Sequence, residues 1–367
     1  MAVADTRQEK LLPPVRERVG ALGWARRNLF STPFNSVLTV LIAYLLYVSI
    51  VPLVEWAIIN ATWWGTSRQD CAADGACWAL VRVRFNQYVY GLYPESEYWR
   101  INLAAVLLVA AMVPLFLQRF THKLPYALGL IVVYPIVAYY LFHGGVFGLP
   151  VVETSRWGGL FLTVVLAGVG ITASLPLGVV LALGRRSKMP AIKTLCVTFI
   201  ELVRGVPLVT ILFMASVMLP LFLPVGTTID KLLRAQVGVA LFASAYMAEV
   251  IRGGLQAIPK GQYEAADAMG LGYWQSMGLI ILPQALRLVI PGIVNTFIGL
   301  FKDTSLVLII GLYDLLGISQ LIIKDPQWLG LGAETYLFAA FGFWIFCFAM
   351  SRYSMALERK LSAKTKH

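Results

Sequence analysis

Long apolar runs, separated by short polar connections, are the feature that most constrains how this chain can fold. A bilayer core about 30 Å thick needs roughly 20 apolar residues for each helical span, and about eight runs approach that length. They lie at about 37–59, 101–117, 125–142, 159–183, 194–222, 237–253, 286–301 and 335–352. Only 13% of the residues are charged and 59% are hydrophobic, which is about half the charged fraction of soluble chains. Backbone groups in lipid must be bonded internally, and the alternating pattern of barrel strands is absent. The sequence therefore predicts an all-α integral membrane protein of about eight transmembrane helices.

The formal net charge of +11 is explained by membrane orientation rather than by nucleic-acid binding. With the N-terminus placed inside, most Lys and Arg residues fall in cytoplasmic segments, as the positive-inside rule requires. We therefore expect both termini in the cytoplasm, contact of the basic segments with anionic membrane lipid, and no nucleic-acid partner. The first apolar run begins too late and is too long for a cleaved signal peptide.

The predicted spans divide the chain into four parts. These are a basic cytoplasmic N-terminus (1–36), three helices with one outer loop at 60–100 (37–150), a segment of five spans with a long cytoplasmic connection at 254–283 (151–357), and a cytoplasmic tail (358–367). The stretch 15–34 fits a helix that lies along the membrane surface. The stretch 306–323, broken by Gly311 and Gly317, is interpreted as an interfacial or re-entrant helix, because a ninth span would place the basic tail outside.

Cysteine and histidine residues give few candidates for chemistry. Cys71 and Cys77 lie in the outer loop, where an oxidising periplasm would allow a disulfide. Two unpaired thiols are an equally good interpretation. The three histidines are scattered without the spacing of metal ligands, so no metal site is predicted.

The cytoplasmic connection is expected to form a helix–turn–helix finger. Pro259 can open a helix, since its missing N–H is unpaired in the first turn anyway. Glu264 and Asp267 are expected near the positive end of that helix, where their charge is favourable. Gly270 permits a left-handed backbone and hence a sharp reversal. A second short helix is then expected to end near Pro283.

The finger also matches a pattern of several fixed positions. The pattern is Glu-Ala-Ala, three residues, Gly, nine residues and Ile-x-Leu-Pro, and it begins at Glu264. It resembles the coupling loop of permease subunits of ATP-binding-cassette (ABC) importers, and every fixed position is matched. The coupling-loop residues are Tyr263, Glu264, Ala265, Ala266, Asp267, Ala268, Met269 and Gly270. The three alanines have almost no side chain, so a partner could approach the helix backbone closely. An ordinary amphipathic connector between two spans is the alternative interpretation.

Three further stretches, 201–207, 248–254 and 302–306, look like signatures of the polar amino acid branch of these importers. That branch includes histidine, glutamine, glutamate and general amino acid permeases. The resemblance covers about 155–357 and implies a type I importer permease core of five helices, preceded here by three extra helices. The chain looks like the longer permease subunit of general L-amino acid systems.

The resemblance implies a set of partners in a bacterial cytoplasmic (inner) membrane. They are an ABC ATPase dimer, a second permease subunit that is a shorter paralogue, and a periplasmic amino-acid-binding protein. The chain has no Gly-x4-Gly-Lys-Ser/Thr sequence, so it lacks a phosphate-cradling loop. We therefore expect no catalytic residue and no cofactor in this chain, with ATP and Mg bound by the partner ATPase.

Arg204 is one candidate for the substrate path or its gate. Charged groups inside a membrane usually have a partner or line water. Arg204 could meet a substrate carboxylate, or it could pair with Glu201 or Glu249 and hold a gate. Pro207 removes a helix hydrogen bond, so a kink is expected beside it.

Polar residues in or beside two predicted spans are further candidates. Ser244 and Asn295 lie at similar depths in two spans, where they could line the path or form helix–helix hydrogen bonds. Lys302 and Asp303, followed by Ser305, lie toward the outer end of a span. They could pair with each other, close an outer gate or meet the binding protein.

Two other classes of protein remain as alternatives. An ATP-independent secondary transporter or channel would be expected to show an inverted repeat or carboxylates deep in its spans, and the sequence shows neither. A membrane scaffold fits the first 150 residues but not the second half of the chain. A permease for another small solute also fits, because coupling loops recur across substrates.

Overall fold

The computed structural model describes residues 20–117, 119–224, 226 and 229–363. The described residues are almost entirely helical, which confirms the all-α prediction, and β1 has only two residues (Tyr313–Asp314). They form two units, one of residues up to Trp64 together with Gln69–Cys77, and one of Gly65–Arg68 with the chain from Trp78 onward.

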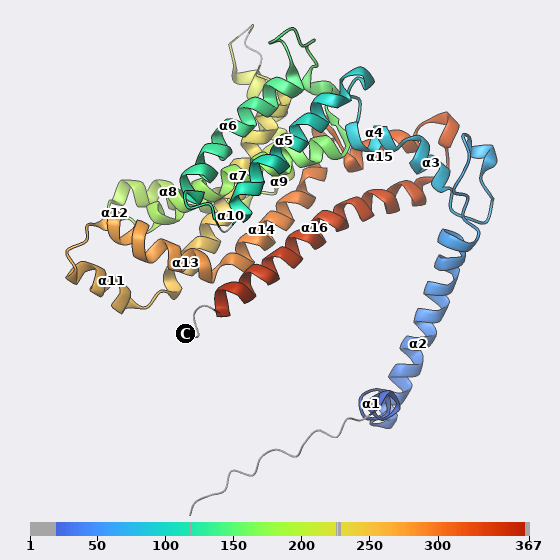
Figure 1. Ribbon diagram of the computed structural model, residues 1–367, viewed down its shortest axis with the longest axis horizontal. Helices are drawn as coiled ribbons and strands as arrows, with labels where there is room; N and C mark the ends of the chain where they lie inside the picture. Colours follow the sequence, from blue (N-terminus) through green and yellow to red (C-terminus); the bar gives the residue numbers. More distant parts are fainter. Residues whose placement is uncertain (1–19, 118, 225, 227–228, 364–367) are drawn as a thin grey trace, which may run out of the picture. The chain divides into compact units, whose positions relative to one another are not determined.

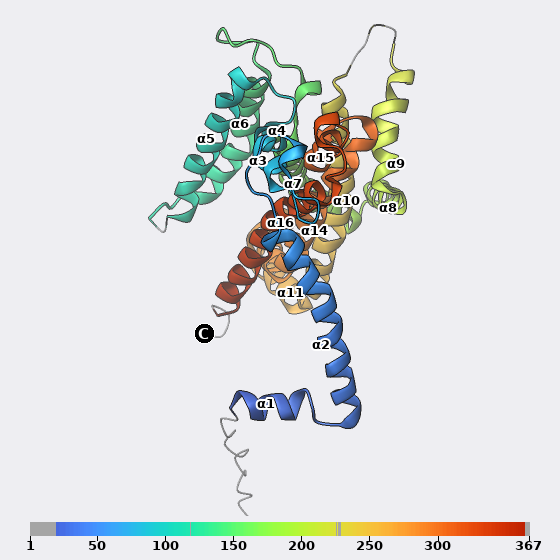
Figure 2. The same ribbon diagram turned by 90° about the vertical axis from the view of Figure 1, so that its right-hand side faces the viewer.

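The first unit contains a short helix and a long one (Figure 1). Its helices are α1 (Ala21–Asn28) and α2 (Pro33–Val54), and a π-helical segment continues α2 to Ile59. Figure 2 shows α1 turned sharply away from the axis of α2. The predicted surface helix at 15–34 is thus shorter in the described part of the chain, and residues 15–19 lie outside it. Cys71 and Cys77 are joined by a disulfide.

The second unit carries all the later helices. The helices that build its main body are α5 (Tyr98–Phe116), α6 (Lys123–His143), α7 (Gly159–Arg185), α8 (Pro190–Gly205), α9 (Leu208–Phe213), α10 (Lys231–Ala257), α13 (Leu282–Leu288), α14 (Ile290–Asp303) and α16 (Gly332–Ala363). The others are α3 (Trp78–Val83), α4 (Phe85–Tyr90), α11 (Lys260–Ala268), α12 (Tyr273–Gln275) and α15 (Leu315–Ile323). α7 and α10 form the centre, because both contribute to the two clusters of buried apolar side chains.

Six helices in the described residues are long and apolar enough to cross a membrane, and the bent pair α8–α9 would make a seventh. The remaining predicted span, 237–253, corresponds to α10, which has 27 residues and a length of about 40 Å. It is less apolar than the other long helices because it carries charged residues, among them Glu249 and Arg252, and one of its faces packs against α7. The predicted number of eight is therefore approximate.

Two segments differ from the sequence prediction. The span predicted at 286–301 is instead a helical segment from Ile290 to Ile310, formed by α14 and a following 3-10 stretch. The chain breaks at Gly311, whose backbone is left-handed, but Gly317 lies inside α15 and its N–H donates to Asp314. With nine residues, α15 spans only about 14 Å, so it is too short to cross a bilayer.

Several segments that connect the spans are tied to one another. Gly158 and Gly159 bridge to β1, and Gly91 bridges to Trp157. Asp314 is fully buried and caps α15 by accepting a hydrogen bond from the Gly317 N–H at 2.9 Å. Burial raises the pKa of the Asp314 carboxyl to about 6, although backbone hydrogen bonds oppose that shift.

Candidate coupling finger and charged cluster

The connection after α10 folds into a helical finger. Its first arm is α11, which begins after Pro259 and ends at Ala268. Gly270 has φ +73°, as predicted, and its N–H donates to the Asp267 carbonyl at 3.0 Å. The second arm runs from Tyr273 through a π-helical stretch into α13. Figure 1 shows this hairpin projecting beyond the ends of α10 and α13.

Three details of the finger differ from the prediction. Pro259 immediately precedes α11 and does not occupy its first turn. Glu264 and Asp267 lie beyond the first turn, so they do not face the positive end of the helix. Pro283 does not end the second arm, because the π-helical stretch before it leads directly into α13.

The two faces of the finger differ in exposure. Ala266 is fully buried, so it packs inward and is not available to a partner. Glu264, Ala265, Asp267, Ala268, Met269 and Gly270 are exposed, and Tyr263 is half-buried. Met269 is 70% exposed and Trp274 in the second arm is 75% exposed. The outer face of the finger therefore combines small, charged and apolar side chains that nothing in the described chain covers.

Hydrogen bonds fix the inner face of the finger to the core. The Tyr263 hydroxyl donates to the Leu255 carbonyl at 3.0 Å, near the end of α10. Arg186 Nη1 donates to the same carbonyl at 3.0 Å and to the Tyr263 hydroxyl at 3.1 Å. On the other arm, Gln284 Nε2 donates to Gln262 Oε1 at 3.1 Å.

A charged cluster lies where α7, α8 and α10 meet. Glu249 on α10 is 14% exposed and contacts three arginines: Arg252 at 2.8 Å, Arg185 at 3.1 Å and Arg204 at 3.6 Å. Arg185 also contacts Glu201 at 2.7 Å. The structure thus pairs Arg204 with Glu249 and places Glu201 on Arg185.

The cluster adjoins a sharp bend in the chain. α8 and α9 meet at 104°, and Pro207 precedes α9 directly, so the predicted kink is present. Arg204 lies at the last turn of α8, and its guanidinium carbon is 5.4 Å from the ring centre of Tyr246. Arg204, directly before the bend, is therefore linked to α10 by its ion pair with Glu249 and its contact with Tyr246.

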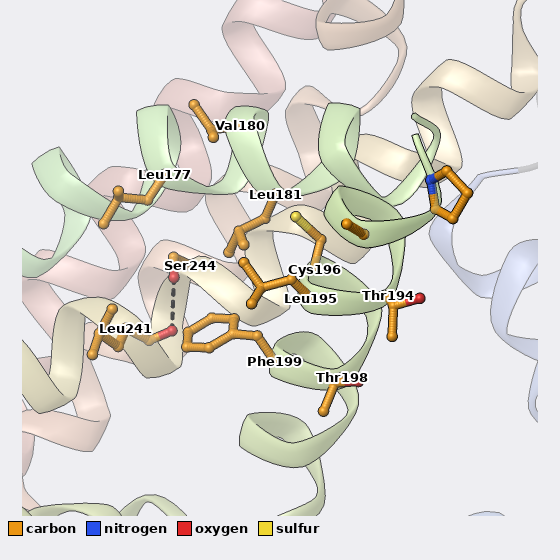
Figure 3. Close-up of a pocket in the computed structure, with 12 residues that line it drawn as sticks. Leu177, Val180, Leu181, Thr194, Leu195, Cys196, Thr198, Phe199, Leu241 and Ser244 are labelled. Atoms are coloured by element: carbon orange, nitrogen blue, oxygen red, sulfur yellow. Dashed lines mark hydrogen bonds between the residues drawn. The ribbon is translucent and has the colours of Figure 1, made fainter. Parts of the chain in front are cut away.

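A cavity of about 930 Å³ lies between α7, α8 and α10 (Figure 3). Its lining is apolar apart from a few hydroxyls, among them Ser244. The Ser244 side chain is buried, and its hydroxyl donates to the Leu241 carbonyl of its own helix at 2.7 Å. The Ser244 hydroxyl therefore forms no hydrogen bond to another helix in the described part of the chain, and it lies on the lining of an apolar cavity.

The remaining predicted path residues lie elsewhere. Asn295 is exposed on α14. Lys302 and Asp303 occupy the last turn of α14, but the helical segment continues to Ile310, so they are not at its outer end. No ion pair joins them in the described part of the chain, and the Ser305 hydroxyl donates to the Lys302 carbonyl at 2.9 Å.

The sequence had indicated only a basic connection after α7, and the specific contacts of Arg185 and Arg186 were not predicted. The signal that could have found them is two consecutive arginines at the end of a span. Neighbouring residues on a helix point about 100° apart, so such a pair can reach two different partners.

The described residues contain no group of three or more metal-ligating side chains that could hold a metal ion.

The long apolar helices define a multi-pass membrane protein. Residues 174–363 match the family model described as binding-protein-dependent transport system inner membrane component. The chain belongs to this family, whose members are the transmembrane components of ABC transporters and are not themselves catalytic.

Individual relatives extend this similarity over nearly the whole chain. The inner membrane amino-acid ABC transporter permease protein YhdY of Escherichia coli (strain K12) is 55% identical over 348 residues, 95% of each chain. The glutamate/glutamine/aspartate/asparagine transport system permease protein BztC of Rhodobacter capsulatus is 42% identical, with 97% of each chain covered. Among solved structures, an amino acid ABC transporter crystallised with histidines is 30% identical, with a TM-score of 0.50, and the match covers 55% of this chain and 92% of that one.

Proposed function

We propose that this chain is the longer permease subunit of an ATP-driven importer of polar L-amino acids. The observation that carries the proposal is similarity over 95% of both chains to an amino-acid ABC transporter permease, at 55% identity. The similarity to BztC supports acidic amino acids and their amides as the class of solute.

The finger from Tyr263 to Gly270 is the proposed contact with the ATPase. Its exposed alanines offer a surface with little side-chain bulk, Met269 adds an exposed apolar side chain, and the inner face is hydrogen-bonded to α10. Movement of the finger would therefore be passed to a long helix of the core. Hydrolysis belongs to the partner ATPase dimer, which binds ATP and Mg, since this chain has no phosphate-cradling loop.

The other proposed partners are a periplasmic amino-acid-binding protein and a second, shorter permease subunit. The three extra helices at 37–150 support a specialised role beside a shorter paralogue. We further propose that both termini and the finger lie in the cytoplasm, because this orientation places most Lys and Arg residues there. The charged cluster at the α8–α9 bend is the proposed inner gate.

The test is to tag this chain, extract it gently from its native membrane and identify the co-purified proteins. We expect an ABC ATPase, one shorter permease and a binding protein, and ATP-dependent uptake of glutamate or glutamine in proteoliposomes. Recovery of this chain alone, with solute movement that needs no ATP, would overturn the proposal. A single permease species present twice would refute only the second-subunit assignment.

A further inference from the structure

Two consecutive arginines at the end of α7 reach two different parts of the molecule. Arg185 is the last residue of α7 and Arg186 follows it directly. Arg185 extends to the charged cluster, where it contacts Glu201 and Glu249. Arg186 extends to the finger, where it contacts Tyr263 and the end of α10.

Arg186 holds the finger at a position where the backbone needs a donor. The last four carbonyls of a helix have no partner within it, and Leu255 lies in the last turn of α10. Its carbonyl accepts from both Arg186 and Tyr263 at 3.0 Å. The Arg186 guanidinium carbon also lies 5.6 Å from the centre of the Tyr263 ring, within the range of a cation–π contact. Tyr263 is the residue of α11 that these three contacts fix.

Arg185 holds the other end of the connection. Its Nη1 is 2.7 Å from Glu201 on α8 and 3.1 Å from Glu249 on α10. Glu249 in turn contacts Arg204, the arginine beside the α8–α9 bend, at 3.6 Å. One guanidinium thus connects α7 to both helices that contribute to the cluster beside the bend.

We propose that Arg185 and Arg186 form a positioning link between the finger and the α8–α9 bend. Because the two residues share one peptide bond, a displacement of Tyr263 that moves Arg186 also moves Arg185. The distances from Arg185 to Glu201 and Glu249 then change, and the ion pair between Glu249 and Arg204 changes with them. The link deepens the proposed function, on which it rests, since it names the route from the ATPase contact to the gate.

The experiment uses the complete importer, with this chain, its partner permease, the ATPase and the binding protein, reconstituted in proteoliposomes. The readouts are ATP hydrolysis without binding protein, its stimulation by amino-acid-loaded binding protein, and amino acid imported per ATP hydrolysed. For Arg186→Gln we expect unstimulated hydrolysis close to wild type, with stimulation and import per ATP lower by about fivefold or more. Arg186→Lys retains the positive charge and N–H donors, although without the planar guanidinium, and should restore part of the loss.

Arg287→Gln is the matched control. Arg287 lies on α13, which continues from the finger, and its side chain is exposed. Within the residues that the structure describes, Arg287 forms no hydrogen bond and no ion pair. The Arg287→Gln variant should therefore leave both stimulation and import per ATP unchanged. Equal losses in Arg287→Gln and Arg186→Gln would overturn the link in favour of a general charge effect.

A second variant, Tyr263→Phe, keeps the ring but removes both hydroxyl hydrogen bonds. If Arg186 and Tyr263 belong to one link, Arg186→Gln combined with Tyr263→Phe should be no worse than Arg186→Gln alone. Multiplying losses in the double variant would overturn the proposal, as would normal stimulation and import in Arg186→Gln. A wild-type complex that shows no ATP-driven import would refute the proposed function itself, whatever the variants do.

Discussion

Replacing Gly270 tests whether the finger depends on its left-handed turn. Gly270 has φ +73°, and a Cβ added there would have open space, with no atom within 4 Å. Any effect of a side chain in the isolated subunit therefore comes from the backbone, not from a steric clash. This separates Gly270 from a glycine that is needed for close packing.

The expected magnitudes follow from the cost of that backbone region. A left-handed conformation costs an ordinary L-residue about 1–2 kcal/mol, and a β-branched residue lies at the upper end. For Gly270→Val, about 2 kcal/mol corresponds to a roughly 30-fold lower population of the native turn. Asn tolerates this region, so Gly270→Asn should retain most of the turn, and Gly270→Ala should be intermediate.

The assay is ATP-driven amino acid uptake in proteoliposomes, at matched amounts of assembled complex. We expect uptake in the order Gly, Asn, Ala, Val at position 270. The control is Gly278→Val in the second arm, since Gly278 also has open space but no positive φ, and it should be close to wild type. Unaltered uptake in Gly270→Val would refute the need for the turn. Equal loss in the Asn and Val variants would show that bulk at the ATPase contact matters instead of backbone strain.

Three further outcomes are expected in detergent-solubilised complex. Glu249→Gln removes ion pairs with three arginines and should lower the free energy of unfolding by about 1–3 kcal/mol. Glu201→Gln changes a carboxylate that is 55% exposed, so it should lower that free energy by less than about 1 kcal/mol. Equal shifts in melting temperature for the two variants would contradict this ranking. Gly254→Ala would place a Cβ 2.6 Å from a backbone oxygen of α13, so it should lower the free energy of unfolding by about 1–3 kcal/mol. The control Gly253→Ala, whose Cβ would lie in open space, should not lower it. An unchanged melting temperature in Gly254→Ala would argue against the close contact between α10 and α13. For Asp314, burial raises the pKa to about 6 from its ordinary value of 3.8, so its contribution to stability is present below about pH 4 and lost as pH rises through about 6. Asp314→Asn keeps an acceptor for the helix cap, so the stability of the variant relative to wild type should rise by up to about 3 kcal/mol between pH 4 and pH 7; a difference that does not change with pH would count against the buried carboxyl.

Local features of the finger could be predicted because their signals are close together in the sequence. A glycine after a run of helix formers is enough to place the turn at Gly270. The second arm was predicted less well. A proline usually marks the end of a helix, but here a π-helical stretch continues directly into α13, which contains Pro283. Ile281 and Met277 of that stretch pack in a buried cluster with residues far away in the chain, and the local sequence does not reveal such contacts.

The contacts of the charged cluster could not be predicted in detail, because they join residues far apart in the chain. Arg185 and Glu249 are separated by two helices and a long loop, yet they lie 3.1 Å apart. The sequence left Arg204 with three possible partners, and the packing of α8 against α10 brings it to Glu249. The burial of α10 could not be predicted from the sequence either. Its charged residues make it less apolar than the other long helices, and its burial depends on the helices packed around it.

The described chain supplies only part of what a polar amino acid would need. An amino acid carries a carboxylate and an ammonium group, and burying either without a charged or hydrogen-bonding partner is costly. The cavity between α7, α8 and α10 has a mainly apolar lining, while the cluster around Glu249 joins its charges to one another. Arg204 is the least tightly held of the three arginines, at 3.6 Å and 35% side-chain exposure. Arg204 is therefore the arginine of the cluster that can exchange its carboxylate partner with the least loss of existing contacts, which is the physical basis for proposing this cluster as a gate.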